Sequence, residues 1–248
     1  KYGIEIIEYK AKKPIPSTCK QYGQPFLSKR VSDYIGRLQK HDFQWEDMPF
    51  DELLHKYCKW NEKRKKWVGC YTALKWWCNK HDCNSYNISQ NKWLKEFIIQ
   101  NNPSFQISSA CCKYSKKDVL KDLLKKTDYD LNIYGVRKAE GGVRASAYKN
   151  CFSENVGSCD EYRPVFFYLN ETKQVYNKHY GVCNSRCYSE YGLKRTGCCG
   201  CPFGKDFEFE LEVIQKYEPK LYAAVVNIFG DSYEYTRKYK EFCKAMAS

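Results

Sequence analysis

The stretch YDLNIYGVRKAEGGVRA, residues 129–145, joins an apolar segment to a basic, glycine-rich loop. Residues 129–136 have the composition of a β-strand that ends at a glycine, and a helix is expected after a short loop near Arg144. In open α/β sheets, ligands bind beyond the carboxyl ends of the strands, which is where this loop falls. The stretch therefore predicts an α/β fold with a binding loop at the end of a strand.

The loop carries side chains that suit an anion. Arg137 and Arg144 can each make bidentate contacts with phosphate or sulfate oxygens. Glu140 could hold an arginine or a ribose hydroxyl, and the two glycines at 141–142 allow backbone donors to approach an anion closely. These residues favour an anion site, and a solvated basic loop is the alternative.

The segments on either side show strand and helix patterns in turn. Residues 3–9 alternate in polarity like a strand, and apolar residues recur at helical spacing in 28–40 and 116–127. Further helices are expected at 50–60, 90–100, 205–217, 219–228 and 231–246. Short strands among helices predict an α/β layered fold with a helical insertion and C-terminal helices.

The composition of the 248 residues is that of a folded, basic protein. Hydrophobic residues make up 43% and aromatic residues 17%, which excludes a disordered chain. The 42 Lys and Arg against 29 Asp and Glu leave a formal charge of +13, which suits phosphate-bearing partners, although a generally basic surface explains it equally. Because the sequence has no transmembrane-length apolar run and residues 1–9 lack signal-peptide features, a cytoplasmic protein without membrane contact is expected.

Fifteen cysteines, an odd number without a secretory signal, favour reduced thiols of which some bind metal. Cys111 and Cys112 are adjacent, and Cys198 and Cys201 have a C-x-x-C spacing that lets one loop place two thiolates on one metal or cluster. Adjacent cysteines suit a cubane, whose irons accept neighbouring thiolates, better than tetrahedral zinc. These four cysteines predict a 4Fe-4S cluster, with Zn²⁺ as the alternative. Cys199 is either a spectator or a replacement for Cys198.

The remaining cysteines carry weaker predictions. A second four-cysteine metal site could be formed by residues in the middle of the chain, namely Cys151, Cys159, Cys183 and Cys187. The scattered cysteines are expected to be small, buried hydrophobic residues, and these are Cys19, Cys58, Cys70 and Cys243.

Residues 59–83 interleave basic residues with tryptophans, a combination that can hold nucleic acid through phosphate contacts and base stacking. The candidate contacts to DNA or RNA are Lys63, Arg64, Lys65, Lys66 and Trp67. The favoured alternative is a helical insertion that buries its tryptophans, because Tyr71, Leu74 and Trp77 follow helical spacing.

Several motifs resemble a known family. Residues 135–145, with their Gly-x-Arg, Glu and Arg-Ala elements, look like a segment of the phosphoadenylylsulfate (PAPS) reductase family, within the adenine-nucleotide α-hydrolase superfamily. Residues 111–117 are similar to the Cys-Cys-x-x-basic-Lys segment of its iron–sulfur adenylylsulfate reductase branch, which also has a C-x-x-C pair like Cys198 and Cys201. Tyr22-Gly23 and residues 28–30 look like reductase-like proteins of bacteria and phages.

The resemblance implies an adenine-nucleotide α-hydrolase-like core with a central, mostly parallel sheet. This core would comprise 1–44 and 101–204, with an insertion at 45–100 and a helical segment at 205–248. Three lysines would join the arginines in binding an adenine nucleotide or sulfonucleotide, namely Lys29, Lys116 and Lys117. The family's Ser-Gly-Gly-Lys-Asp-Ser phosphate loop is not in this sequence. The N-terminal strands and that loop are therefore expected on a further segment, of the same chain or another.

The expected function is that of a PAPS reductase-like enzyme, acting in sulfuryl or sulfur transfer or on a nucleotide α-phosphate. The family's Glu-Cys-Gly-Leu-His tail is not found at the end of this sequence, where residues 242–248 read FCKAMAS, and this disfavours true sulfate reduction. Two alternatives stay open: a sulfurtransferase that modifies DNA or RNA, and a non-catalytic, metal-stabilised module that binds nucleotides or nucleic acid. A homo-oligomer is compatible with each of them.

Overall fold

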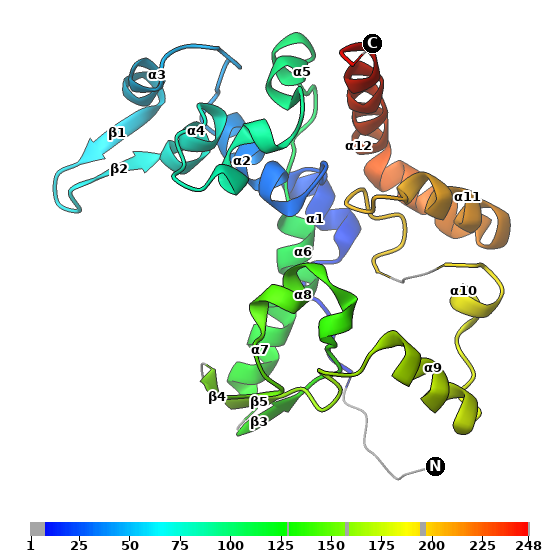
Figure 1. Ribbon diagram of the computed structural model, residues 1–248. Coiled ribbons are helices and arrows are strands. Elements are labelled where there is room, and N and C mark those ends of the chain that lie inside the picture. Colours follow the sequence, from blue (N-terminus) through cyan, green and yellow to red (C-terminus); the bar gives the residue numbers. More distant parts are fainter. Residues whose placement is uncertain (1–7, 128, 157–158, 194–196, 248) are drawn as a thin grey trace. The chain divides into compact units, whose positions relative to one another are not determined.

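The structure is a computed structural model that describes residues 8–127, 129–156, 159–193 and 197–247, without the side chains of 142–144 and 155–156 (Figure 1). The strand expected at 3–9 lies almost wholly outside the described residues. The chain forms two compact units. Unit 1 comprises Lys1–Tyr9 and Asp118–Arg195, and unit 2 comprises Lys10–Lys117 and Thr196–Ser248. The expected α/β core is thus divided between both units, and 45–100 belongs to the same unit as the C-terminal helices.

Unit 2 is mainly helical. Its α-helices are α1 (Ile15–Tyr22), α2 (Lys29–Gln39), α3 (Phe50–Tyr57), α4 (Tyr71–Trp77), α5 (Leu94–Gln100), α6 (Ala110–Cys112), α11 (Phe207–Tyr217) and α12 (Pro219–Ala245). It also contains the 3₁₀ turns η1 (Asn84–Tyr86) and η2 (Ile88–Gln90), a π-turn η3 (Lys113–Lys117), and the strands β1 (Cys58–Asn61) and β2 (Lys66–Gly69).

The helix α2 shows why the apolar periodicity predicted its position well. Ser28 caps its N-terminus, because the Ser28 hydroxyl accepts a hydrogen bond of 3.2 Å from the backbone N–H of Val31. Val31, Ile35 and Leu38 then fall on one face and are buried in the main core of unit 2. Burial of that face supplies most of the stability of a helix of this length.

The helices predicted at 50–60, 219–228 and 231–246 of unit 2 are confirmed as helical, but their bounds are wrong. The two helices expected at 219–228 and 231–246 are one continuous helix, α12, which runs through Gly230. A glycine inside a helix costs about 1 kcal/mol relative to alanine, and burial of Phe229 and Tyr233 on either side offsets that cost. The predicted helix over 50–60 ends at Tyr57, because the chain then enters a β-hairpin.

This hairpin, residues 58–69, replaces the first part of the tryptophan-rich segment that was expected to be helical (Figure 1). β1 and β2 pair antiparallel with Trp60 directly opposite Trp67, and their rings meet edge to face at 5.6 Å between centroids. Cross-strand aromatic pairs of this kind stabilise hairpins. Helical periodicity resumes only at α4.

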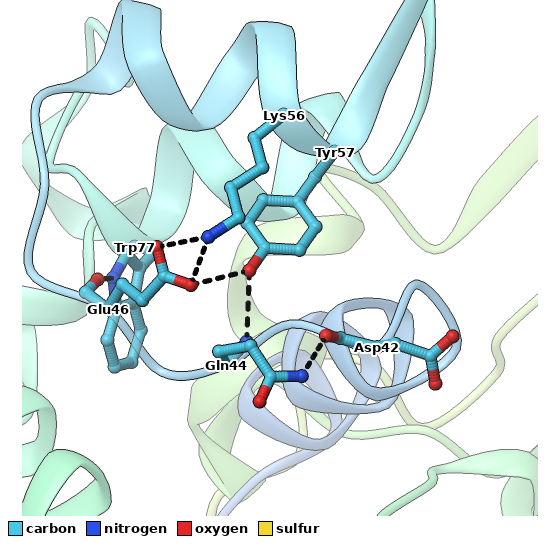
Figure 2. A network of polar contacts seen from close by, with 6 residues as sticks. All are labelled: Asp42, Gln44, Glu46, Lys56, Tyr57 and Trp77. Atoms are coloured by element: carbon cyan, nitrogen blue, oxygen red, sulfur yellow. Dashed lines mark hydrogen bonds and ion pairs between the residues drawn. The ribbon is translucent and has the colours of Figure 1, made fainter.

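The core of unit 2 contains Trp76 and Trp77, which are fully buried. Figure 2 shows Lys56, Tyr57 and the indole of Trp77 converging on Glu46. The Trp77 indole donates to the Glu46 backbone carbonyl at 2.8 Å, and Lys56 Nζ and Tyr57 Oη donate to its carboxylate at 2.6 and 2.8 Å. The hydrogen bond from Lys56 lowers the pKa of Glu46, so this carboxylate stays ionised and holds the loop before α3 onto the core.

Unit 1 is built around a small mixed sheet. Its strands are β3 (Leu131–Ile133), β4 (Phe152–Val156) and β5 (Cys159–Tyr162), and its helices are η4 (Lys138–Glu140), α7 (Asp118–Lys126), α8 (Gly142–Ala147), α9 (Asn170–His179) and α10 (Arg186–Ser189). The strand order is β3-β5-β4, with β3 parallel and β4 antiparallel to β5. The described chain is therefore mixed α/β with small sheets, and the predicted strand at 129–136 is confirmed in its central part.

One face of this sheet is apolar and exposed. The register places Ile133, Tyr162 and Phe152 in one row across the three strands, with 60%, 38% and 41% of their surfaces exposed. Folded proteins rarely leave such rows uncovered. The exposure suits the expectation that a further segment packs on unit 1, and that expectation stays a prediction.

The opposite face is organised by Arg163, which is completely buried. Its guanidinium donates to the Glu161 carboxylate at 2.8 Å, to the Tyr134 hydroxyl at 2.8 Å and to the Ser153 hydroxyl. Tyr134 in turn donates to Glu161 at 2.5 Å. A buried charge is stable only when it is paired in this way, so Glu161 is the essential partner.

We predict that Glu161→Gln lowers the free energy that protects the backbone amides of the unit 1 sheet from hydrogen exchange. The expected decrease is roughly 1.5–3 kcal/mol, the range for a hydrogen bond to a charged group. Hydrogen exchange followed by mass spectrometry on peptides from 129–163 measures this change. The matched control is Glu190→Gln, because the Arg186–Glu190 ion pair is exposed and contributes little. Equal effects of the two substitutions would show that the buried pair does not hold the sheet.

Within the described ranges, no helix combines the length and the apolar character that crossing a bilayer requires.

Candidate functional site

Thiols from three separate segments of unit 2 gather at one place. Cys19 lies on α1, Cys111 and Cys112 lie on α6, and Cys201 follows in the loop before α11. Cys19 and Cys111 are buried in a second apolar cluster with Phe207, Leu211, Ile214, Val225, Phe229 and Tyr233, and Cys112 and Cys199 pack against it. We call Cys19, Cys111, Cys112, Cys198, Cys199 and Cys201 the thiol cluster.

The three helical thiols interact directly. A hydrogen bond with Cys111 lowers the pKa of Cys19. The hydrogen bond with Cys112 lowers the pKa of Cys111, but the bond to Cys19, burial and the neighbouring thiolate charges outweigh it and raise that pKa to about 12. The bond to Cys111 and burial also raise the pKa of Cys112. Cys111 therefore interacts with both Cys19 and Cys112, and the three thiols form one hydrogen-bonded group.

Cys201 faces the same group of thiols. Burial is the largest cause of its raised pKa, and the charges of Cys112 and Cys198 act in the same direction. The charge of Cys201 in turn acts on Cys19 and Cys111. The C-x-x-C loop thus brings Cys201 near both the helical thiols and Cys198.

The loop needs a glycine at position 200. Gly200 has φ +59°, and a Cβ atom there would lie 2.8 Å from the Tyr233 hydroxyl and 3.0 Å from Val225. The Tyr233 hydroxyl donates a hydrogen bond to the Gly200 carbonyl, and the Cys201 N–H bonds the Cys198 carbonyl at 3.2 Å. The loop therefore lies directly against α12, which sets where its cysteines can point.

Two of the predicted phosphate-binding lysines lie beside the thiol cluster. The positive charges of Lys29 and Lys116 both act on Cys112, where they oppose the rise of its pKa. Lys29 is the first residue of α2, and Lys116 belongs to the π-turn η3 that directly follows α6. Lys117 closes the same turn. The site thus combines soft sulfur donors with a cationic side.

Cys19 is the member of the thiol cluster that sequence reasoning missed. It had been assigned to the scattered, structural cysteines, because no second cysteine lies near it in sequence. Ile15, Cys19 and Tyr22 share one face of α1, and Tyr22 stacks on Tyr114 at 5.0 Å between ring centroids. This contact between α1 and the segment after α6 is what brings Cys19 to Cys111.

Within the described parts of the chain, no three Cys, His, Asp or Glu side chains are already arranged to hold a metal ion. The thiols instead hydrogen-bond to one another, as protonated thiols do. The donor chemistry nevertheless fits a thiolate-bound metal or cluster, since the cluster offers more than the four sulfurs that such a site takes. The four cysteines of the predicted second site differ in burial: Cys159 is buried and begins β5, Cys151 and Cys187 are half-buried, and Cys183 is exposed.

The predicted anion loop lies in unit 1. Arg137 Nη1 donates to the Leu169 carbonyl and to the Asn170 side-chain oxygen, each at 3.1 Å, and its Nε lies 3.9 Å from Glu140. Glu140 therefore holds an arginine, which was one of its two predicted roles. The side chain of Arg144 lies outside the described residues. Gly141 has φ +69° and open space where a Cβ would be, so its backbone can approach a ligand.

No family model, curated protein or solved structure matches this chain.

Proposed function

We propose that the thiol cluster of unit 2 binds a 4Fe-4S cluster, with Zn²⁺ as the alternative, in a PAPS reductase-like enzyme that binds an adenine nucleotide or sulfonucleotide. The observation that carries the proposal is the convergence of thiols from α1, α6 and the loop before α11. Buried cysteines that serve only as small hydrophobic residues have no need to meet in this way.

The surroundings suit thiolate ligands. Phe207, Val225 and Phe229 exclude water from one side of the thiol cluster. Lys29 and Lys116 supply positive charge on Cys112, which favours the deprotonated form that a metal requires. Because ligation would release the thiol protons, metal binding is expected to strengthen as the pH rises.

The same two lysines suggest what the site acts on. An iron–sulfur cluster, when bound, supplies redox capacity or a fixed charge at this position. Lys29 and Lys116 would bind an anionic group of the substrate and neutralise oxyanion charge as it develops on a sulfuryl group or an α-phosphate. The proposed reaction is therefore sulfuryl or sulfur transfer, or chemistry at a nucleotide α-phosphate.

The loop at 137–144 is proposed to hold the nucleotide's phosphate or sulfate. We expect Arg144→Ala to weaken binding of an adenine nucleotide at least about tenfold, which corresponds to the loss of one charge-assisted contact of ~1.5 kcal/mol. Isothermal titration with adenosine 3′,5′-bisphosphate measures the affinity. The control is Lys149→Ala, which removes an exposed cation from the same unit. Unchanged affinity in the Arg144 variant would place this arginine on the solvated surface.

The metal part of the proposal is tested separately, by iron, sulfide and zinc analysis of protein purified without air. An iron and sulfide content near four each per chain supports a 4Fe-4S cluster. Protein that retains none of the three elements, after reconstitution with iron and sulfide or with zinc, would refute the proposal.

A further inference from the structure

The β1–β2 hairpin, whose place in the fold is seen in Figure 1, carries basic side chains that the proposed enzyme site does not use. Five basic residues lie on it or at its turn, and all five are exposed. We call them the hairpin cations: Lys59, Lys63, Arg64, Lys65 and Lys66. Within the described residues, none of them forms an ion pair with an acidic side chain. Glu62 is the one acidic residue in this segment, so the turn is strongly positive.

The hairpin also carries an exposed aromatic side chain. Trp60 has 45% of its surface exposed, whereas Trp76 and Trp77 are buried in the core. Its edge-to-face contact with Trp67 holds it in place, and Trp67 is itself held by an edge contact with His55 at 5.3 Å. Trp60 is therefore a positioned ring that presents part of its surface to solvent.

The register of the hairpin determines how these groups are arranged. Trp60 and Trp67 are directly opposite each other and share one face, while Lys59 and Lys66 alternate to the other face. Lys63, Arg64 and Lys65 occupy the turn between the faces, where Lys65 takes a left-handed conformation with φ 46°. An extended polyanion that crosses the turn can thus contact cations while one of its planar groups reaches Trp60.

We infer that the hairpin binds single-stranded nucleic acid, with the hairpin cations on successive phosphates and a base stacked on Trp60. Stacking on an exposed aromatic ring combined with a basic groove is the physical basis of sequence-tolerant single-strand binding. In a duplex the bases are paired and stacked on each other, so Trp60 would gain no contact. An acidic peptide offers no base for Trp60, and an anionic membrane requires more apolar surface than one partly exposed tryptophan provides.

This binding does not depend on the thiol cluster, since no cysteine of that cluster lies on the hairpin. The inference goes beyond the proposed enzyme site and gives unit 2 a second ligand, a polynucleotide strand. If the hairpin binds strands and the thiols bind no metal, only the proposed function fails. If the thiols bind a metal and the hairpin does not bind a nucleic-acid strand, only this inference fails.

The experiment is a fluorescence anisotropy titration of the full chain with a labelled oligothymidylate of roughly 20 nucleotides, at several salt concentrations. Five phosphate contacts predict that affinity falls about 100-fold between 50 and 200 mM salt. The triple variant Lys63→Gln, Arg64→Gln, Lys66→Gln should bind about 100-fold more weakly at 0.1 M salt, with the slope against log salt reduced by about 2. Lys65 is retained in this variant because its backbone conformation is unusual.

The matched control removes the same charge elsewhere: Lys121→Gln, Lys125→Gln, Lys173→Gln, all exposed on unit 1. It should leave the affinity and slope close to those of the unmodified chain. Trp60→Ala should cost roughly tenfold in affinity, and Trp60→Phe should restore most of it, because phenylalanine keeps a stacking face. If Trp60 had a purely structural role, the affinity for the oligonucleotide would not depend in this way on whether residue 60 has an aromatic ring.

Three results would overturn the inference. They are equal losses in the hairpin and control triples, unchanged binding in Trp60→Ala, and binding of phosphatidylserine vesicles in preference to the oligonucleotide. A blunt duplex of the same length serves as a further probe, and tighter binding of the duplex would exclude base stacking on Trp60.

Discussion

Replacing Cys201 by serine is expected to remove nearly all iron and sulfide, and the brown colour, from protein purified and reconstituted without air. The unsubstituted chain should hold about four iron and four sulfide. We expect this effect because Cys201 lies near Cys19, Cys111 and Cys112, so it is the thiol by which the loop joins the helical thiols. A serine hydroxyl is a far weaker ligand than a thiolate for iron.

Single substitutions of Cys19 and Cys198 decide which of these two thiols completes the four ligands of the proposed 4Fe-4S cluster. The sequence motif predicts a complete loss of cluster in Cys198→Ser and none in Cys19→Ser. Burial of Cys19 against Cys111 leads us to expect a loss in Cys19→Ser as well. Cys83→Ser is the control, because that cysteine is exposed and bonds Ser85 outside the thiol cluster. About one zinc per chain with no visible absorbance would contradict the iron–sulfur assignment and leave a structural zinc site.

Replacing Trp77 by alanine is expected to destabilise unit 2 by roughly 3–5 kcal/mol, the range for removal of a large buried aromatic side chain. Trp77 is fully buried, contacts Phe43 and Trp45, and donates from its indole to Glu46. The substitution therefore creates a cavity and also leaves the Glu46 carbonyl without its donor (Figure 2).

Urea unfolding followed by tryptophan fluorescence measures this change. All six tryptophans lie between residues 45 and 93, so the signal reports unit 2. Trp60→Ala is the control: the same chemical change at a half-exposed position should cost less than ~1 kcal/mol. If both variants unfold at the same urea concentration, the assignment of Trp77 to the core and Trp60 to the surface is wrong.

These two tryptophans show where sequence reasoning reached its limit. The spacing of Tyr71, Leu74 and Trp77 predicted a helix, and α4 confirms it together with the burial of Trp77. The same reasoning extended the helical insertion back to Trp60, where the chain forms a hairpin instead. Strand pairing depends on which segment lies opposite, and short-range periodicity does not contain that information.

The sequence by itself determined the helices with a strong apolar face, such as α2 and α11, because that face must be buried whatever covers it. It also identified the segments that carry Cys111, Cys112 and Cys201. Only the tertiary structure decided that Cys19 joins them, that Arg137 is held by Leu169 and Asn170, and that Gly230 does not break α12. Each of these outcomes depends on contacts between residues far apart in the chain, and such contacts outweigh local preferences of about 1 kcal/mol.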